Sequence, residues 1–189
     1  MIIFNENLTA LQLELIDFED KIQALASVMK LDLKDYEIDH LALRVNSEQN
    51  AKIWLTRLLK CGRILSDNIV NGRSIYLIQL ERPLAFAGQL VDVIELPFPK
   101  NKQYLQETWE HIEIVIPFLA DESIEAWIGR INRQFLWQHL TQLTIKVSEP
   151  KVEGERLPNP SIAVSFADKS ANHTCIKVHP YSIKKILEV

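Results

Sequence analysis

The sequence is short of glycine and cysteine, and it has neither a long hydrophobic run nor a cluster of basic residues. Five glycines in 189 residues and no low-complexity stretch argue against a long flexible linker. Cys61 and Cys175 form neither a CxxC pair nor a disulfide framework, which favours a reducing compartment, with one disulfide between them as the open alternative. The longest apolar runs, such as Ile112–Ala120, are broken by charge or proline well before the ~20 residues that span a bilayer.

Charge and composition limit the partners that the chain is expected to have. The formal net charge is -4 and the basic residues are scattered, so we expect neither nucleic acid nor a membrane surface as the main partner. The stretch Met1–Glu6 has no basic region and no small-residue cleavage site, so we expect no secretory signal. Hydrophobic residues make up 47% of the chain, enough for a sizeable core. We therefore predict a folded cytoplasmic protein.

The first 34 residues are predicted to form a helical segment that precedes the main fold. Apolar residues recur every three or four positions over residues 8–31, which is typical of a helix with one buried face. The acidic stretch Asp17–Asp20 suggests a kink or a break. The pattern therefore predicts either one bent helix or a helical hairpin.

Residues 35–100 form the first of two similar units. The pattern predicts, in order, a strand at 38–45, a helix at 48–61 and strands at 63–70, 73–80 and 89–96. Asn46-Ser47 provides the helix N-cap, and Gly62 is expected to end the helix in the left-handed conformation. Asn71-Gly72 is a hairpin signal between two of the strands, and Pro97 stops the last strand.

Residues 101–189 repeat the same order with insertions. We expect a strand at 109–117, a helix opening at 121–123, a further helical run at 135–143, a loop at 148–160 and strands at 144–147, 162–167 and 175–178. A weak internal repeat of this kind indicates two βαβββ modules packed side by side. The predicted fold is therefore α+β, with a curved mixed sheet, an N-terminal helical extension and one structural unit. Two modules in one chain favour a monomer or a weak dimer.

Two of the five histidines occupy the same place in the two modules. His40 and His111 are each the third residue of the opening strand, in Ile38-Asp39-His40 and Trp109-Glu110-His111. Strand alternation places both on the face opposite the apolar residues that pack under the helices. A lone histidine in a strand is more often structural than a ligand, but two at equivalent positions favour a shared site.

The closing strands add one more potential ligand from each module. Glu95 and His179 lie on the strand faces that alternate away from the apolar residues. Either one could instead be a solvated strand end. Together with His40 and His111 they form a donor set suited to Zn, Fe, Mn, Ni or Co, with coordination positions left for water and substrate. We predict a divalent metal site at these four residues and regard His139 and His173 as ordinary.

The opening strands also carry a family resemblance. Ile38–Val45 and Trp109–Val115 are similar to the first strands of the two modules in the vicinal oxygen chelate superfamily, whose members include glyoxalase I, extradiol dioxygenases and methylmalonyl-CoA epimerase. Within it the chain looks most like the YecM group of small bacterial proteins, which add an N-terminal helical segment. The resemblance covers about residues 36–180 for the superfamily and nearly the whole chain for the group.

The resemblance implies a role for each matched residue. His40, Glu95 and His111 match metal ligands of the family, and His179 takes the last position, where many relatives have Glu. This difference weakens the comparison with glyoxalase, in which that Glu serves as a base. Glu113, which shares a strand face with His111, is a substitute ligand or base, so the candidate catalytic residues are Glu95 and Glu113.

Three further residues are candidates for binding the substrate. Arg44 shares the face of His40 and could clamp a carboxylate, or simply form an ion pair with a neighbouring acid. Tyr76 and Lys177 could line the same cavity, with Cys175 beside them. A register slip of one residue would turn Tyr76 away.

Three functions remain open at this point. The first is a metal-dependent enzyme that binds a small substrate through adjacent oxygens and performs isomerase, lyase or oxygenase chemistry. The second is a protein of the same fold that binds a small molecule without turnover. The third is an interaction protein that docks through its N-terminal helices.

Overall fold

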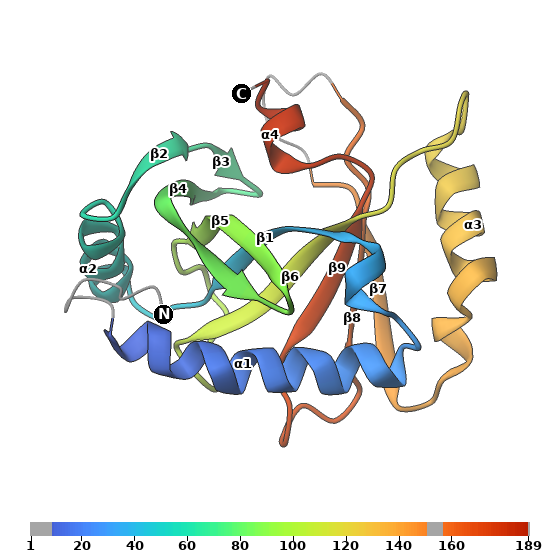
Figure 1. Ribbon diagram of the computed structural model, residues 1–189, viewed down its shortest axis with the longest axis horizontal. Coiled ribbons are helices and arrows are strands. Elements are labelled where there is room, and N and C mark those ends of the chain that lie inside the picture. The colour runs from blue at the N-terminus through green and yellow to red at the C-terminus, as the bar shows by residue number, and fades with distance from the viewer. Residues whose placement is uncertain (1–8, 151–156, 189) are drawn as a thin grey trace.

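The computed structural model describes residues 9–150 and 157–188, which build one mixed sheet with helices on its outer side (Figure 1). The nine strands follow the order β2-β4-β5-β1-β6-β9-β8-β7, with β3 paired to β4. In chain order the elements are α1 (Thr9–Val28), a 3-10 turn (Leu33–Asp35), β1 (Glu37–Leu43), α2 (Glu48–Leu58), β2 (Gly62–Ser66), β3 (Ile69–Val70), β4 (Arg73–Phe86), β5 (Gln89–Pro97), β6 (Trp109–Val115), α3 (Ile124–Phe135), a 3-10 turn (Trp137–His139), β7 (Leu143–Ser148), β8 (Ser161–Phe166), β9 (Cys175–His179) and α4 (Ile183–Ile186).

The strand order confirms the predicted α+β fold with two βαβββ modules. In each module the first strand pairs in parallel with the last, β1 with β5 and β6 with β9. The two modules join through the antiparallel pair β1–β6 in the middle of the sheet. Because β1 pairs with β6, the opening strands of both modules lie side by side in the middle of the sheet (Figure 1). Their polar residues can therefore share one side of the sheet.

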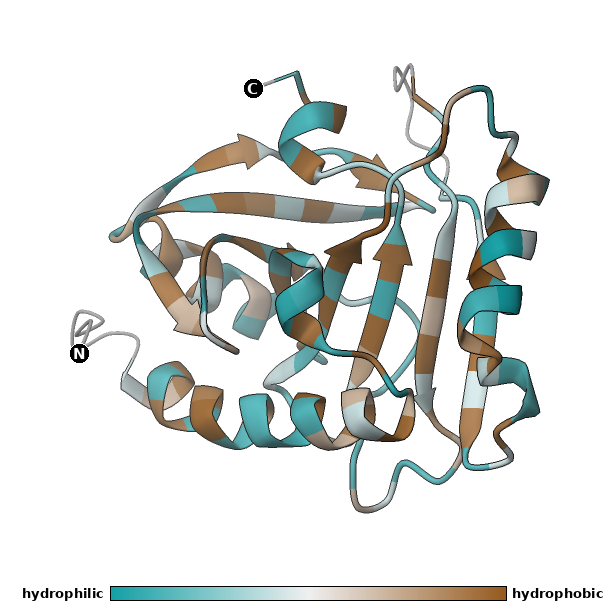
Figure 2. Cartoon of the chain, turned by 45° about the vertical axis from the view of Figure 1, so that its right-hand side comes forward, coloured by the Kyte–Doolittle hydropathy of each residue, from teal (hydrophilic) through white to brown (hydrophobic). Residues whose placement is uncertain are grey.

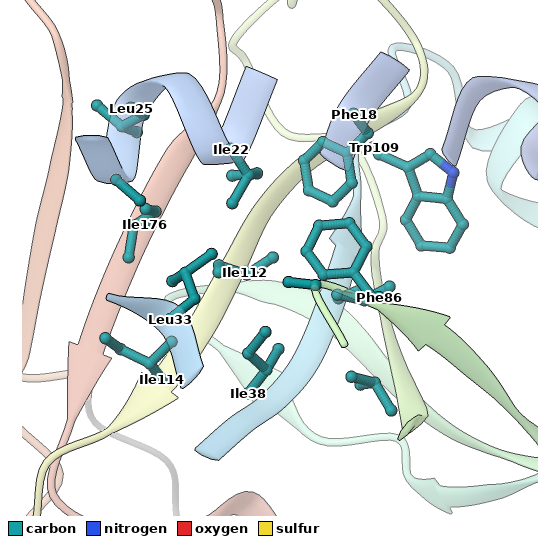
Figure 3. Close-up of a cluster of buried hydrophobic side chains, with 14 of the residues drawn as sticks. Phe18, Ile22, Leu25, Leu33, Ile38, Phe86, Trp109, Ile112, Ile114 and Ile176 are labelled. Atoms are coloured by element: carbon teal, nitrogen blue, oxygen red, sulfur yellow. The ribbon is translucent and has the colours of Figure 1, made fainter. Parts of the chain in front are cut away.

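Helix α1 runs unbroken along the apolar side of the sheet, so the predicted break at Asp17–Asp20 and the hairpin alternative are wrong. Its buried residues continue at helical spacing through that stretch; they are Leu11, Leu15, Phe18, Ile22, Leu25 and Ala26. Packing of this stripe outweighs the local acidic cluster. Figure 3 shows Phe18, Ile22 and Leu25 facing side chains of the central strands, among them Ile112 and Ile176. Leu8, where the helix was expected to begin, lies outside the described residues.

The two faces of the sheet differ in character. Buried apolar side chains such as Ile38, Ile112 and Ile176 form the core under the helices. Hydrophobic and hydrophilic residues alternate along the central strands in Figure 2, as expected when only one face packs against helices. None of the helices in the described part of the chain is both long and apolar enough to cross a membrane.

Gly62 does not act as the left-handed end of a helix. Helix α2 is capped by Ser47 as predicted but ends at Leu58, and Gly62 is the first residue of β2. A Cβ atom at this position would lie 2.3 Å from the carbonyl oxygen of Gln79 on β4. Glycine is therefore required here because the two strands approach closely. In the sequence alone, a glycine at this position cannot be told apart from one that ends a helix.

Other local features also differ from what the sequence predicted. The expected helix at 135–143 is a single 3-10 turn, because Leu136 adopts a left-handed conformation, φ 55°, and ends α3. Strand β4 continues six residues beyond the predicted end, to a second turn at Ala87-Gly88. The short helix α4 was not predicted. Cys61 and Cys175 are both free thiols, so the disulfide alternative is wrong.

Candidate metal centre

Four side chains converge on the polar face at the middle of the sheet. His40, Glu95, His111 and Glu113 each offer a ligand atom, and these atoms all lie within 4.8 Å of one another. The strand register explains the convergence, because His40 is directly opposite Glu113, and Ala42 lies between Glu95 on one side and His111 on the other. Neighbouring strands thus bring four donors from three strands to one place.

A β-bulge places an acidic residue beside each histidine. Asp39 is the extra residue between Ile38 and His40 in the β1–β6 ladder, so simple alternation fails at this point. Its carboxylate lies on the polar face with His40, where Oδ2 is 2.9 Å from Nδ1 of that ring. The ring is thereby fixed with Nε2 pointing toward the cluster.

The second module repeats this arrangement. The register shifts again between Ala42 and Leu43, where Glu110 is the extra residue on β6. Glu110 Oε2 lies 2.5 Å from Nδ1 of His111. We did not predict a role for either acid, although the signal was present in the sequence as an acidic residue immediately before each of the two histidines.

The histidine atoms that face the centre are buried and lack a hydrogen-bond partner. Nε2 of His40 and Nε2 of His111 are both in this state. Their distances to the carboxylate oxygens of Glu95 and Glu113 fall between 3.4 and 3.7 Å, too long for good hydrogen bonds. Ligand atoms about 2.0–2.2 Å from a shared ion lie about 3–3.6 Å from one another. The donor set therefore fits a divalent metal ion.

The net charge of the cluster also favours a bound divalent cation. Four carboxylates, from Asp39, Glu95, Glu110 and Glu113, are gathered around two cations, Arg44 and Lys177. With neutral histidines the sum is four negative charges against two positive ones, which leaves two negative charges in a largely buried site. A divalent cation would neutralise them.

These neighbouring charges shift the pKa values of the side chains in the cluster. Burial alone would raise the pKa of the Glu95 carboxyl, but Lys177 and His40 hold it well below its ordinary value. The pKa of Glu113 is likewise held well below its usual range against the effect of burial, chiefly by Lys177. Burial lowers the pKa of His40, yet Glu113 and Asp39 outweigh it and raise that pKa well above normal. The site thus favours positive charge at its centre.

Arg44 contacts Glu95, Glu110 and His111, and it is too buried to meet a substrate. Its side chain is 6% exposed, with Nη1 donating to the Leu43 carbonyl at 2.8 Å and to Glu95 Oε1 at 3.2 Å. Nη2 lies 3.3 Å from Nδ1 of His111 and 3.5 Å from Glu110. The ion-pair alternative considered for Arg44 therefore describes its position better than a substrate clamp.

His179 lies next to the four-residue cluster but is not part of it. Its Nδ1 is 3.3 Å from Glu113 Oε2 and its Nε2 is 3.3 Å from Asp39 Oδ2. The register explains why. Glu95 is paired with Ala42 on β1, and the equivalent pair in the second module is Lys177 with Glu113. Lys177, not His179, therefore occupies the position equivalent to Glu95, and Glu113 brings the second carboxylate.

Tyr76 faces away from the cluster. Leu77 is the residue of β4 that pairs with Glu95, whereas Tyr76 pairs with Leu96 on the apolar side. Its ring packs against Phe98, with the ring centroids 5.3 Å apart. The register is the alternative in which Tyr76 is turned away from the site.

Comparison with known proteins identifies the family. The family model described as YecM protein matches residues 7–189. The Escherichia coli protein YecM is 35% identical over 170 residues, which cover 90% of this chain and 87% of that protein. The chain belongs to the YecM family. A Haemophilus influenzae protein is 74% identical over 182 residues, covering 96% of this chain and 94% of its own length.

One solved structure shares this fold along the whole chain. The structural-genomics protein EC4020 superposes with a TM-score of 0.80 at 32% identity, covering 100% of this chain and 97% of its own. Methylmalonyl-CoA epimerase from Mycobacterium tuberculosis is a more distant likeness, with a TM-score of 0.42 and 15% identity, covering 75% of this chain and 85% of the epimerase.

Proposed function

We propose that this YecM-family chain binds one divalent metal ion through His40, Glu95, His111 and Glu113 and uses it to act on a small, oxygen-bearing substrate. The observation that supports this most directly is the pair of buried, unpartnered Nε2 atoms facing two carboxylates at 3.4–3.7 Å. A buried polar nitrogen without a partner costs about 1–3 kcal/mol, a penalty that coordination would remove. The donor set leaves the metal's identity open among Zn, Fe, Mn, Ni and Co.

Each side chain has a definite part in this proposal. Asp39 and Glu110 hold the two rings with the Nε2 lone pairs directed at the ion. When bound, the ion would supply Lewis-acid stabilisation of negative charge on a substrate oxygen. Glu95 and Glu113 are the candidate bases, and Glu113 differs from Glu95 in that its Oε2 lies 3.3 Å from Nδ1 of His179. That ring gives an accepted proton a second place to go.

Metal uptake tests the proposal directly. Purified protein, stripped with a chelator and dialysed against Zn²⁺ or Mn²⁺, should retain about one equivalent of metal. The double variant His40→Ala/His111→Ala should retain none, and His139→Ala is the matched control because His139 is exposed and far from the cluster in sequence. Uptake of one equivalent by a folded double variant would remove the proposal.

A further inference from the structure

The two halves of the candidate metal centre are related by the strand register, and two of the equivalent positions carry different kinds of residue. His40 and His111 are equivalent, as are Ala42 and Glu113, because the β1–β6 ladder pairs His40 with Glu113 and Ala42 with His111. The neighbouring closing strands extend the equivalence to Glu95 and Lys177. The carboxylate of Glu95 in the first module is thus matched by the ammonium group of Lys177 in the second.

Lys177 is held beside the cluster but is not used up by it. Its Nζ lies 3.1 Å from Glu113 Oε1, and its side chain is 24% exposed, against 0–13% for His40, Glu95, His111 and Glu113. A lysine ammonium has three N–H donors. Glu113 is the acceptor that it contacts among the residues that the structure describes, which leaves two of its donors for another acceptor.

Arg44 cannot take the same role. Its guanidinium is 6% exposed and lies between Glu95, Glu110 and the Leu43 carbonyl. Of the two cations in the cluster, Lys177 is therefore the one that an incoming molecule can reach.

We infer that Lys177 forms an anion subsite next to the metal, and that the substrate carries a carboxylate or another anionic oxygen held jointly by the ion and this ammonium group. The inference rests on the proposed metal site and names the substrate class for it. With a divalent ion bound, the four carboxylates would be balanced by the ion, Arg44 and Lys177, so an anionic oxygen would no longer meet an excess of negative charge and could accept a hydrogen bond from Lys177.

Oxalate is a suitable probe because it is small, anionic and has adjacent oxygens. Protein loaded with Co²⁺ should change its visible absorption on titration with oxalate, while metal analysis after gel filtration shows whether the ion stays bound. Lys177→Met should keep the metal and bind oxalate about 10- to 100-fold more weakly, since a charge-assisted hydrogen bond is lost. Lys177→Arg should stay close to the wild type, and Lys52→Met, on the exposed side of α2, should be unchanged.

The outcomes separate this inference from the metal proposal. If the wild type does not retain Co²⁺, the metal site itself is wrong. If the wild type retains Co²⁺ but its visible absorption does not change with oxalate, the anion subsite alone is overturned. The same holds if Lys177→Met binds oxalate as tightly as the wild type. If Lys177→Met and Lys177→Gln fold but lose the metal, the lysine is a structural counter-ion of Glu113, which also overturns it.

Discussion

Asp39 and His40 are consecutive in a strand and yet lie on the same face of the sheet, joined by a 2.9 Å contact between Oδ2 and Nδ1. The β-bulge makes this possible, and the equivalent bulge joins Glu110 to His111. A second contact ties the same carboxylate to helix α4, because the backbone N–H of Ile183 donates to both oxygens of Asp39 at 3.0 Å. The orientation of a candidate metal ligand is thus fixed by the start of a helix near the C-terminus.

The acidic residue before each histidine should matter for metal affinity without being a ligand. Asp39→Asn and Glu110→Gln should each weaken binding of Zn²⁺ about 10- to 100-fold, because the rings lose the charged partner that holds their Nε2 atoms in place. Competition with a fluorescent chelator measures the change. Asp168→Asn, at an exposed turn, is the control. Unchanged affinity in both variants would mean that Asp39 and Glu110 do not orient the two histidine rings.

Removal of metal should lower the thermal stability of the protein. The proposed site exists only in the folded protein, because the unfolded chain does not hold the four donors together. Saturation with metal at about 100 times Kd should therefore stabilise the fold by about 2.7 kcal/mol. Thermal denaturation monitored by circular dichroism, with EDTA and with added Zn²⁺, checks this. The double variant His40→Ala/His111→Ala should melt at the same temperature in both solutions, and a metal-dependent shift in that variant would contradict the assignment of the ligands.

Gly62→Ala should destabilise the fold more than an ordinary strand substitution. The added Cβ would lie 2.3 Å from the Gln79 carbonyl oxygen, so β2 and β4 would have to move apart, at a cost of about 1–3 kcal/mol. Urea denaturation gives the difference. Gly129→Ala is the matched comparison, because Gly129 lies within α3, where the nearest atom belongs to the flexible end of Arg133. There alanine should stabilise by up to about 1 kcal/mol, and equal effects at both sites would contradict the steric argument.

Helix α4 should loosen in acid because of one ion pair. Lys184 Nζ lies 2.7 Å from Asp92 Oδ2, and the pKa of Asp92 is lowered, with burial opposing the effect of Gln79 and Lys184. A lowered folded-state pKa means that the contribution is complete above the unfolded value of about 3.9 and is lost as pH falls through the folded value. The pair is partly exposed, so it contributes less than about 1 kcal/mol.

The urea midpoint, measured from pH 5 to pH 2, checks this pair. It should fall less steeply for Lys184→Met than for the wild type, and Lys185→Met should follow the wild type because Lys185 lies over the Tyr181 ring instead. Parallel pH profiles for all three proteins would show that the Asp92 pair contributes nothing.

The topology could be predicted from the sequence because apolar and polar residues alternate clearly in the strands of both modules. His40 and His111 could be placed on one polar face by period two alone, since both lie next to the regular part of the β1–β6 ladder. The same rule could not place Asp39 or Glu110, because each is an extra residue in a bulge, and bulges depend on the pairing of two distant strands.

The alignment of the closing strands failed for a related reason. His179 looked like the counterpart of Glu95 because it is the donor-bearing residue nearest the strand end. The paired register instead matches Glu95 with Lys177, two residues earlier. Register between strands 64 residues apart is set by tertiary packing, and a single sequence gives no measure of it. Glu113, predicted as a substitute ligand or base, belongs to the four-residue cluster.

The central β1–β6 ladder also determines when the proposed metal site can form during synthesis. His40 and Glu95 belong to one module and His111 and Glu113 to the other, and these halves meet only across that ladder. Lys177, which contacts Glu113, arrives later still, on β9. A nascent chain emerging from the ribosome has only half of the donors until β6 is made. If the proposed site binds an ion, the four donors can therefore hold it only after β1 and β6 have paired.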